Sequence, residues 1–157
     1  MKYSELLVPY NPWWTNITTA FEMVPLFHRP VFKEILYGLK EAQQIISITG
    51  PRRVGKSTLI KQIAKQLISE GISPEKIIYY SMDDPALYRA AVDHDGFFDA
   101  LMEEARTRAG SGLMYVFLDE VQQQIKRPLE SLCFHQTGER RFIRKEICRL
   151  VAIMFHG

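Results

Sequence analysis

One eight-residue loop constrains the fold of this chain more than any other feature of its 157 residues. Residues 50–57 read Gly-Pro-Arg-Arg-Val-Gly-Lys-Ser, a Gly-x-x-x-x-Gly-Lys-Ser pattern whose glycines let the backbone curl around phosphate groups. The loop follows a strand-like run at residues 45–49 and precedes a helix-like run that begins at Ser57. An unoccupied glycine turn is the alternative, and the strand and helix on either side argue against it. The sequence therefore predicts a parallel α/β sheet that binds a nucleoside triphosphate at the end of one strand.

The chemistry of such a loop assigns roles to its side chains. Lys56 would place a positive charge on the β- and γ-phosphates and support catalysis, and the hydroxyl of Ser57 would reach Mg²⁺. The helix N-terminus adds a partial positive charge that favours anions. The candidate nucleotide-binding residues are Gly50, Pro51, Arg52, Arg53, Val54, Gly55, Lys56, Ser57 and Thr58.

A second motif, an acidic pair after an apolar run, agrees with the first. Residues 113–118 are all apolar, as is typical of a buried parallel strand, and Asp119 and Glu120 follow them directly. The carboxyl ends of parallel strands form the ligand edge of a sheet. Asp119 is therefore a candidate Mg²⁺ ligand through the water shell of the ion, and Glu120 a candidate base that orients and deprotonates the attacking water. Taken alone, the two acids would also fit a solvated pair at a strand end.

Composition and length fit one globular domain. Hydrophobic residues make up 46% of the chain, which is enough for a single core. No apolar run approaches the roughly 18 residues of a membrane span and the N-terminus lacks a signal pattern, so we expect a cytoplasmic protein with no membrane partner. Cys133 and Cys148 read as reduced thiols, and the four scattered histidines predict no zinc site.

Charge is distributed unevenly along the chain, although the net charge is only +2. Residues 1–120 hold 13 Lys and Arg against 15 Asp and Glu, a net charge of −2, whereas residues 121–157 hold 7 against 3, a net charge of +4. Glutamates interrupt the cations of this basic tail, which usually makes a solvated face and is weak evidence for a nucleic-acid partner. The composition thus changes directly after the acidic pair.

The remaining pattern alternates strands and helices, as βαβ units do. The expected elements are a helix from Pro30, a strand at 45–49, a helix over 59–68, a strand at 77–82, a helix over 97–105 capped by Asp95, and a strand at 113–118. The aromatic residues 1–28 are expected to pack on this domain, with residues 9–14 non-helical. Asp83 and Asp84 precede a proline, so they either form a turn or lie in a second shell around Mg²⁺.

Several segments resemble the predicted AAA-type ATPases that are widespread in archaea and bacteria. They are Asn11-Pro12-Trp13-Trp14, Arg29-Pro30-Val31-Phe32, residues 48–58, Ser81-Met82-Asp83-Asp84-Pro85, and the Phe-Leu-Asp-Glu-Val-Gln string at 117–122. The resemblance implies an additional-strand P-loop fold with ATP as the nucleotide. It also implies that Lys56 and Ser57 lie at the phosphates and Mg²⁺, Asp119 at Mg²⁺, and Glu120 at the attacking water. It divides the chain into an N-terminal aromatic segment (1–28), an ATPase core (29–122) and a divergent tail (123–157).

The tail leaves two alternatives open. Members of that group continue with a strand that lies between the phosphate-loop strand and the acidic-pair strand and ends in a polar sensor. Residues 150–157 would supply this strand, cut before the sensor, or residues 141–155 would form an amphipathic helix. A truncated or frame-shifted remainder of the core would explain why the resemblance fades after residue 122.

The leading functional hypothesis is Mg²⁺-dependent ATP binding and hydrolysis by an AAA-type module that drives a conformational change in attached parts. Besides ATP, an unidentified protein or nucleic-acid partner and an oligomer are compatible with it. The alternatives are a fragment that binds nucleotide without hydrolysis and, less favoured, a small-molecule kinase. No Asn/Thr-Lys-x-Asp string that would read guanine occurs. Arg52 and Arg53 either supply a cation to the γ-phosphate or face a partner.

Overall fold

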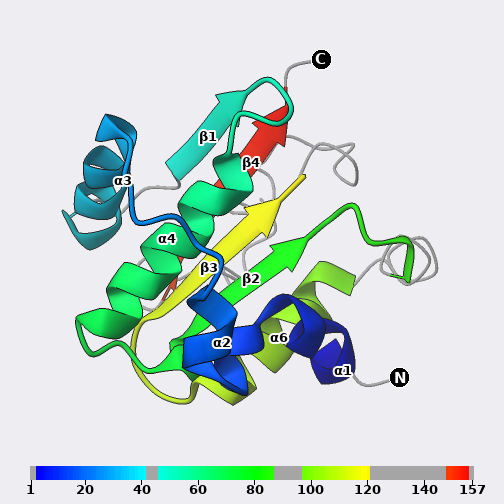
Figure 1. Ribbon diagram of the computed structural model, residues 1–157. Helices are drawn as coiled ribbons and strands as arrows, with labels where there is room; N and C mark the ends of the chain where they lie inside the picture. Colours follow the sequence, from blue (N-terminus) through cyan, green and yellow to red (C-terminus); the bar gives the residue numbers. More distant parts are fainter. Residues whose placement is uncertain (1–2, 42–45, 87–96, 121–147, 156–157) are drawn as a thin grey trace.

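Four parallel strands form the centre of the protein (Figure 1). The computed structural model describes residues 3–41, 46–86, 97–120 and 148–155. The strands are β1 (Ile46–Gly50), β2 (Ile77–Ser81), β3 (Met114–Asp119) and β4 (Cys148–Phe155), and their order across the sheet is β1-β4-β3-β2. All three pairings are parallel. The α/β fold predicted from the sequence is confirmed.

The middle of the sheet is completed by β4, which lies between β1 and β3. Ile46 pairs with Val151, and Val116 pairs with Leu150. Its nearly continuous apolar sequence is typical of the inner strands of a parallel sheet. The strand alternative for this segment is therefore confirmed, and the alternative of a helix over 141–155 is wrong for residues 148–155. Residues 123–147 and the proposed cap Asp95 lie outside the described residues.

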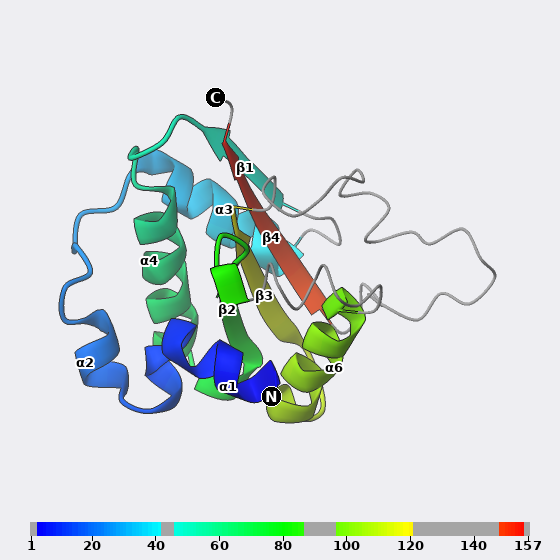
Figure 2. The same cartoon turned by 90° about the vertical axis from the view of Figure 1, so that its right-hand side faces the viewer.

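Helices cover both faces of the sheet. Figure 2 views the sheet along its edge, with α4 (Lys56–Ser69) on one side and α6 (Phe97–Ala109) on the other. The helix α3 (Pro30–Glu41) contributes Phe32, Ile35 and Leu39 to the core on the α4 side. The core on the α4 side contains Trp13, Phe21, Phe32, Ile35, Leu39, Leu59, Ile60, Ile63, Ala64, Leu67, Ile77, Tyr79, Tyr115 and Phe117. Strand side chains alternate between the faces, so the other buried set, with Tyr80, Val116 and Leu118, faces α6. None of the helices in the described residues is long and apolar enough to cross a bilayer.

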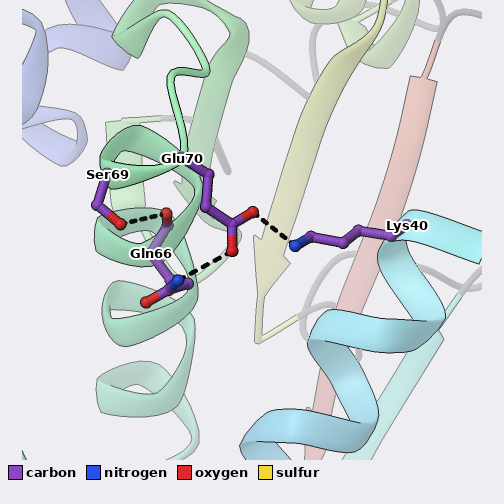
Figure 3. A network of polar contacts seen from close by, with 4 residues as sticks. All are labelled: Lys40, Gln66, Ser69 and Glu70. Atoms are coloured by element: carbon purple, nitrogen blue, oxygen red, sulfur yellow. Dashed lines mark hydrogen bonds and ion pairs between the residues drawn. The ribbon is translucent and has the colours of Figure 1, made fainter.

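A polar network joins the ends of the two helices on the α4 side (Figure 3). The ammonium of Lys40 lies 2.6 Å from the carboxylate of Glu70, which also accepts a hydrogen bond from Gln66. The hydrogen bond from Gln66, and then that from Lys40, lower the pKa of Glu70. Both charged side chains are about one-third exposed or more, so this pair contributes only about 0–1 kcal/mol of stability.

The N-terminal segment is compact and lies against the edge of β2. It consists of α1 (Tyr3–Leu7), two short 3₁₀ turns, η1 (Val8–Tyr10) and η2 (Pro12–Trp14), and α2 (Ile17–Phe21). The prediction that residues 9–14 are non-helical holds for Asn11 and is wrong for the rest, which form 3₁₀ turns, because prolines fit the first turn of a helix, where no N–H donor is needed. A further 3₁₀ turn, η3 (Pro74–Lys76), precedes β2.

Side chains of this segment satisfy the outer edge of β2. The buried amide of Asn11 donates to the carbonyl of Tyr79 at 2.8 Å and accepts from its N–H at 2.6 Å. The indole N–H groups of Trp13 and Trp14 both donate to the carbonyl of Ile77. An edge strand presents unpaired backbone groups, which are costly when buried. Here a side-chain amide and two indoles take the place of a neighbouring strand.

Candidate nucleotide-binding site

The phosphate loop joins the end of β1 to the start of α4, at the edge of the sheet to which the strand arrows point (Figure 1). Two of its residues have left-handed backbone conformations, Arg53 with φ of 60° and Gly55 with φ of 87°. Glycine adopts this region without steric cost, whereas other residues lose about 1–2 kcal/mol there. The glycine at position 55 is therefore required by the turn that starts α4.

Lys56 points back into the loop. Its side chain is buried, and its ammonium donates to the carbonyl of Gly50 at 2.9 Å and to the carbonyl of Pro51. These contacts hold a positive charge under the loop, where phosphate oxygens would compete with the two carbonyls for it. Pro51, Arg52 and Arg53 are exposed.

A short hydrogen bond connects the phosphate loop to the end of β3. Ser57 donates to Oδ2 of Asp119 at 2.5 Å, across 62 residues of sequence. Asp119 is 4% exposed. Hard oxygen donors of this kind suit Mg²⁺, which binds through one or two protein groups and completes its shell with water and phosphate. The two residues that the sequence assigns to the metal therefore lie together and fit that ion.

Two more donors hold the Asp119 carboxylate. The hydroxyl of Tyr79 donates to the same Oδ2 at 2.8 Å, and the backbone N–H of Glu120 donates to Oδ1 at 2.9 Å. Burial first, and the nearby Asp119 second, raise the pKa of Tyr79 well above its ordinary value, so this hydroxyl stays a donor. Tyr79 is not among the predicted site residues, because a tyrosine within an aromatic strand carries no motif.

Glu120 is held in a strained backbone conformation. Its φ is 55°, a left-handed value that costs a non-glycine residue about 1–3 kcal/mol and is found mainly at functional sites. This backbone strain at Glu120, the predicted base, is an indication of a functional site that the sequence does not contain.

Asp84, in the second acidic pair, has a different role. The carboxylate of Asp84 accepts a hydrogen bond from the hydroxyl of Tyr10 at 2.6 Å and another from the N–H of Ala86 at 2.7 Å. The contact from Ala86 lies in the turn after β2, and the contact from Tyr10 ties this turn to the N-terminal segment, so the turn alternative fits Asp84 better than a place around Mg²⁺.

A pocket of about 230 Å³ lies beside the phosphate loop. The residues lining it are Pro25, Phe27, Arg29, Gly55, Thr58, Leu59 and Gln62. Gln62 on α4 donates to the carbonyls of Pro25 and Phe27, both at 2.8 Å, and thereby fixes the N-terminal wall. Of the predicted binding residues, Gly55 and Thr58 face this pocket, whereas its wall at residues 25–29 was not predicted as part of the site.

Comparison with known proteins agrees with this geometry. The profile of a family described as AAA domain matches residues 42–142, which is more than half of the chain. The structure of C. elegans PCH-2 matches 89% of this chain with a TM-score of 0.54 at 16% sequence identity, a likeness of fold alone. The chain spans 41% of the length of that protein. No curated protein sequence gives a significant match. From the parallel sheet, the phosphate loop and the family match together, we conclude that the chain belongs to the AAA domain family of nucleotide-binding, ATPase-type proteins.

Proposed function

We propose that this chain binds ATP together with Mg²⁺ and hydrolyses it to ADP and phosphate. The observation that carries the proposal is the 2.5 Å hydrogen bond between Ser57 and Asp119. It joins the phosphate loop to the acidic end of β3 in one buried site, so that phosphate and metal groups would meet there.

Each residue of the site has a part in this proposal. Lys56 would exchange its two carbonyl partners for phosphate oxygens, and the N-terminus of α4 would add partial positive charge. When bound, Mg²⁺ would neutralise charge that develops on the phosphates, and Ser57 and Asp119 are the residues that would hold it. Neither residue needs to move far, because they are already in contact.

Hydrolysis would use Glu120 as the base. Its carboxylate would take a proton from water while the water oxygen attacks the γ-phosphorus. The bond from this phosphorus to the bridging oxygen would break, and ADP would leave. The position of Glu120, one residue after Asp119 in a strained turn, supports this assignment.

The pocket beside the loop fits the base end of the nucleotide. It has an apolar wall at Pro25 and Phe27 and polar groups at Thr58 and Gln62. Such a mixture of apolar surface and few polar groups is typical of small-molecule sites. Its place next to Gly55 would let one nucleotide reach both the loop and the pocket.

Calorimetric titration with a non-hydrolysable ATP analogue tests the proposal. Lys56→Ala should lose affinity by at least about tenfold, since it removes a charge-assisted contact to the phosphates. Lys61→Ala, an exposed lysine on the same helix, is the matched control and should bind like the unaltered chain. Equal affinity of both variants would refute the site. Binding without ATP turnover would instead favour the non-hydrolysing alternative.

A further inference from the structure

We infer that Tyr79 is a positioning residue for the metal-binding site, because its hydroxyl orients the Asp119 carboxylate and its backbone is fixed from outside the sheet by Asn11. This inference rests on the proposed function, since it assigns Asp119 to Mg²⁺.

The hydrogen bonds of Asp119 leave its charge available to a cation. Among the described residues, three neutral donors contact it, namely two hydroxyls on Oδ2 and one backbone N–H on Oδ1. Buried carboxylates are normally paired with a cation or a metal ion, because burial of a lone charge is costly. The neutral donors fix the direction of the carboxylate and keep a negative charge at the edge of the sheet where Mg²⁺ would bind.

The hydroxyl of Tyr79 has a function that a phenylalanine could not supply. The ring packs in the hydrophobic core on the α4 side of the sheet, where phenylalanine would pack as well. Burial of a hydroxyl is costly unless it forms a hydrogen bond, and here the hydroxyl donates to Oδ2 of Asp119 at 2.8 Å. When Ser57 turns a lone pair toward the metal, Tyr79 would keep the carboxylate in place. Outer partners of this kind typically change metal affinity about 10–100-fold.

The backbone of Tyr79 is fixed at the same residue. Asn11 pairs with both its N–H and its carbonyl, at 2.6 Å and 2.8 Å, while Tyr79 pairs with Phe117 of β3 on the other side. Asn11 is itself fully buried and donates to the carbonyl of Leu7 at 2.7 Å. The N-terminal segment therefore fixes the position of the Tyr79 ring beside β3. This position in turn determines the distance from the hydroxyl to the Asp119 carboxylate.

The neighbouring residue offers a matched control. Tyr80 is also buried, but its side chain faces the α6 side, and its hydroxyl has no hydrogen-bond partner among the described residues. Tyr79→Phe and Tyr80→Phe thus remove the same atom from adjacent buried positions. Only the first removes a contact to Asp119.

The experiment measures the affinity of a non-hydrolysable ATP analogue by calorimetry, in EDTA and over a series of Mg²⁺ concentrations. Tyr79→Phe should raise the Mg²⁺ concentration for half-maximal enhancement of affinity by about tenfold and leave the affinity in EDTA unchanged. Tyr80→Phe should match the unaltered chain in both. In an Asp119→Asn background the effect of Tyr79→Phe should disappear, because the hydroxyl acts through that carboxylate.

Several outcomes would overturn the inference. They are an unchanged Mg²⁺ midpoint in Tyr79→Phe, an equal shift in Tyr80→Phe, or a Tyr79→Phe effect that persists without the Asp119 carboxylate. If these occur while Asp119→Asn still abolishes the Mg²⁺ dependence, the proposed function stands and the inference alone fails. If the unaltered chain shows no Mg²⁺ dependence, both fail.

A measurement on the unaltered chain covers the case in which Tyr79→Phe does not fold. The hydroxyl proton of Tyr79, followed by NMR, should stay protected from solvent exchange both without nucleotide and with the analogue and Mg²⁺ bound. Loss of its protection on addition of Mg²⁺ would contradict a role in holding Asp119.

Discussion

The hydroxyl of Ser57, in the first turn of α4, lies 2.5 Å from the carboxylate of Asp119, the last residue of β3. This contact spans 62 residues and joins the two motifs on which the proposed activity depends. Because both residues sit at ends of regular elements, rigid parts of the fold rather than long loops set the distance between them.

The adjacent acids should separate binding from turnover. Glu120→Gln should bind ATP as the unaltered chain does and lose hydrolysis by about 10²–10⁴-fold, since an amide cannot accept the proton of water. Asp119→Asn should instead weaken the Mg²⁺-dependent part of binding. Paired calorimetry and phosphate-release assays would show this, and equal loss of binding in both variants would contradict the separate roles.

Gly55→Ala should lose both stability and nucleotide affinity. Its φ of 87° costs alanine about 1–2 kcal/mol, and any relief of that strain would move the N–H groups of the loop. Gly71→Ala is the control, with φ of 97° and open space around the glycine. It should lose similar stability in urea denaturation yet keep its affinity for the analogue. Retained affinity in Gly55→Ala would show that loop geometry is not critical.

Asn11→Ala should be one of the more destabilising single changes in the N-terminal segment. It leaves the buried N–H and carbonyl of Tyr79 without their partner, at about 1–3 kcal/mol for each group. Asn16→Ala removes only an exposed cap contact to the N–H of Thr19 and should cost about 1 kcal/mol. Urea denaturation of the two variants measures the difference, and equal losses would mean that water replaces Asn11 at the strand edge.

Stability should fall at high pH because folding raises the pKa of the half-buried Tyr10. Burial first, and then the hydrogen bond to Asp84, raise the pKa of Tyr10 from 10.0 to about 12. A raised pKa means that the folded state holds the proton more tightly, so this contribution is complete below pH 10 and is lost as pH rises through about 12. Tyr10→Phe should show a shallower loss of unfolding free energy over that window. An identical pH profile in the variant would contradict the assignment.

The sequence predicted the parts of this structure that depend on contiguous residues. The loop at 50–57 and the strand before Asp119 each carry their pattern within a few positions, and the elements β1, α4, β2 and β3 appear close to the predicted places. The sequence alone allows a strand at residues 150–157 or a helix over 141–155, because a short apolar run has no period that separates the two. In the structure residues 148–155 form the strand β4, which pairs with β1 and β3.

Contacts between distant segments could not be predicted in this way. Asn11 forms hydrogen bonds with Tyr79 across 68 residues of sequence, and Tyr79 forms one with Asp119 across 40. The pocket wall at residues 25–29 likewise depends on how Gln62 holds the chain. Such relationships follow from packing, whereas a motif describes only one of the partners.

The position of β4 has a consequence for how the protein is made. In the described part of the chain β1 pairs with β4 alone, and β4 is the last of the four strands to be synthesised. A chain without residues 148–155 can pair β2 with β3, but β1 then has no strand to join it to them. The strand that carries the phosphate loop therefore enters the sheet late in synthesis, and a nascent chain stalled before residue 148 should not yet bind nucleotide at full affinity.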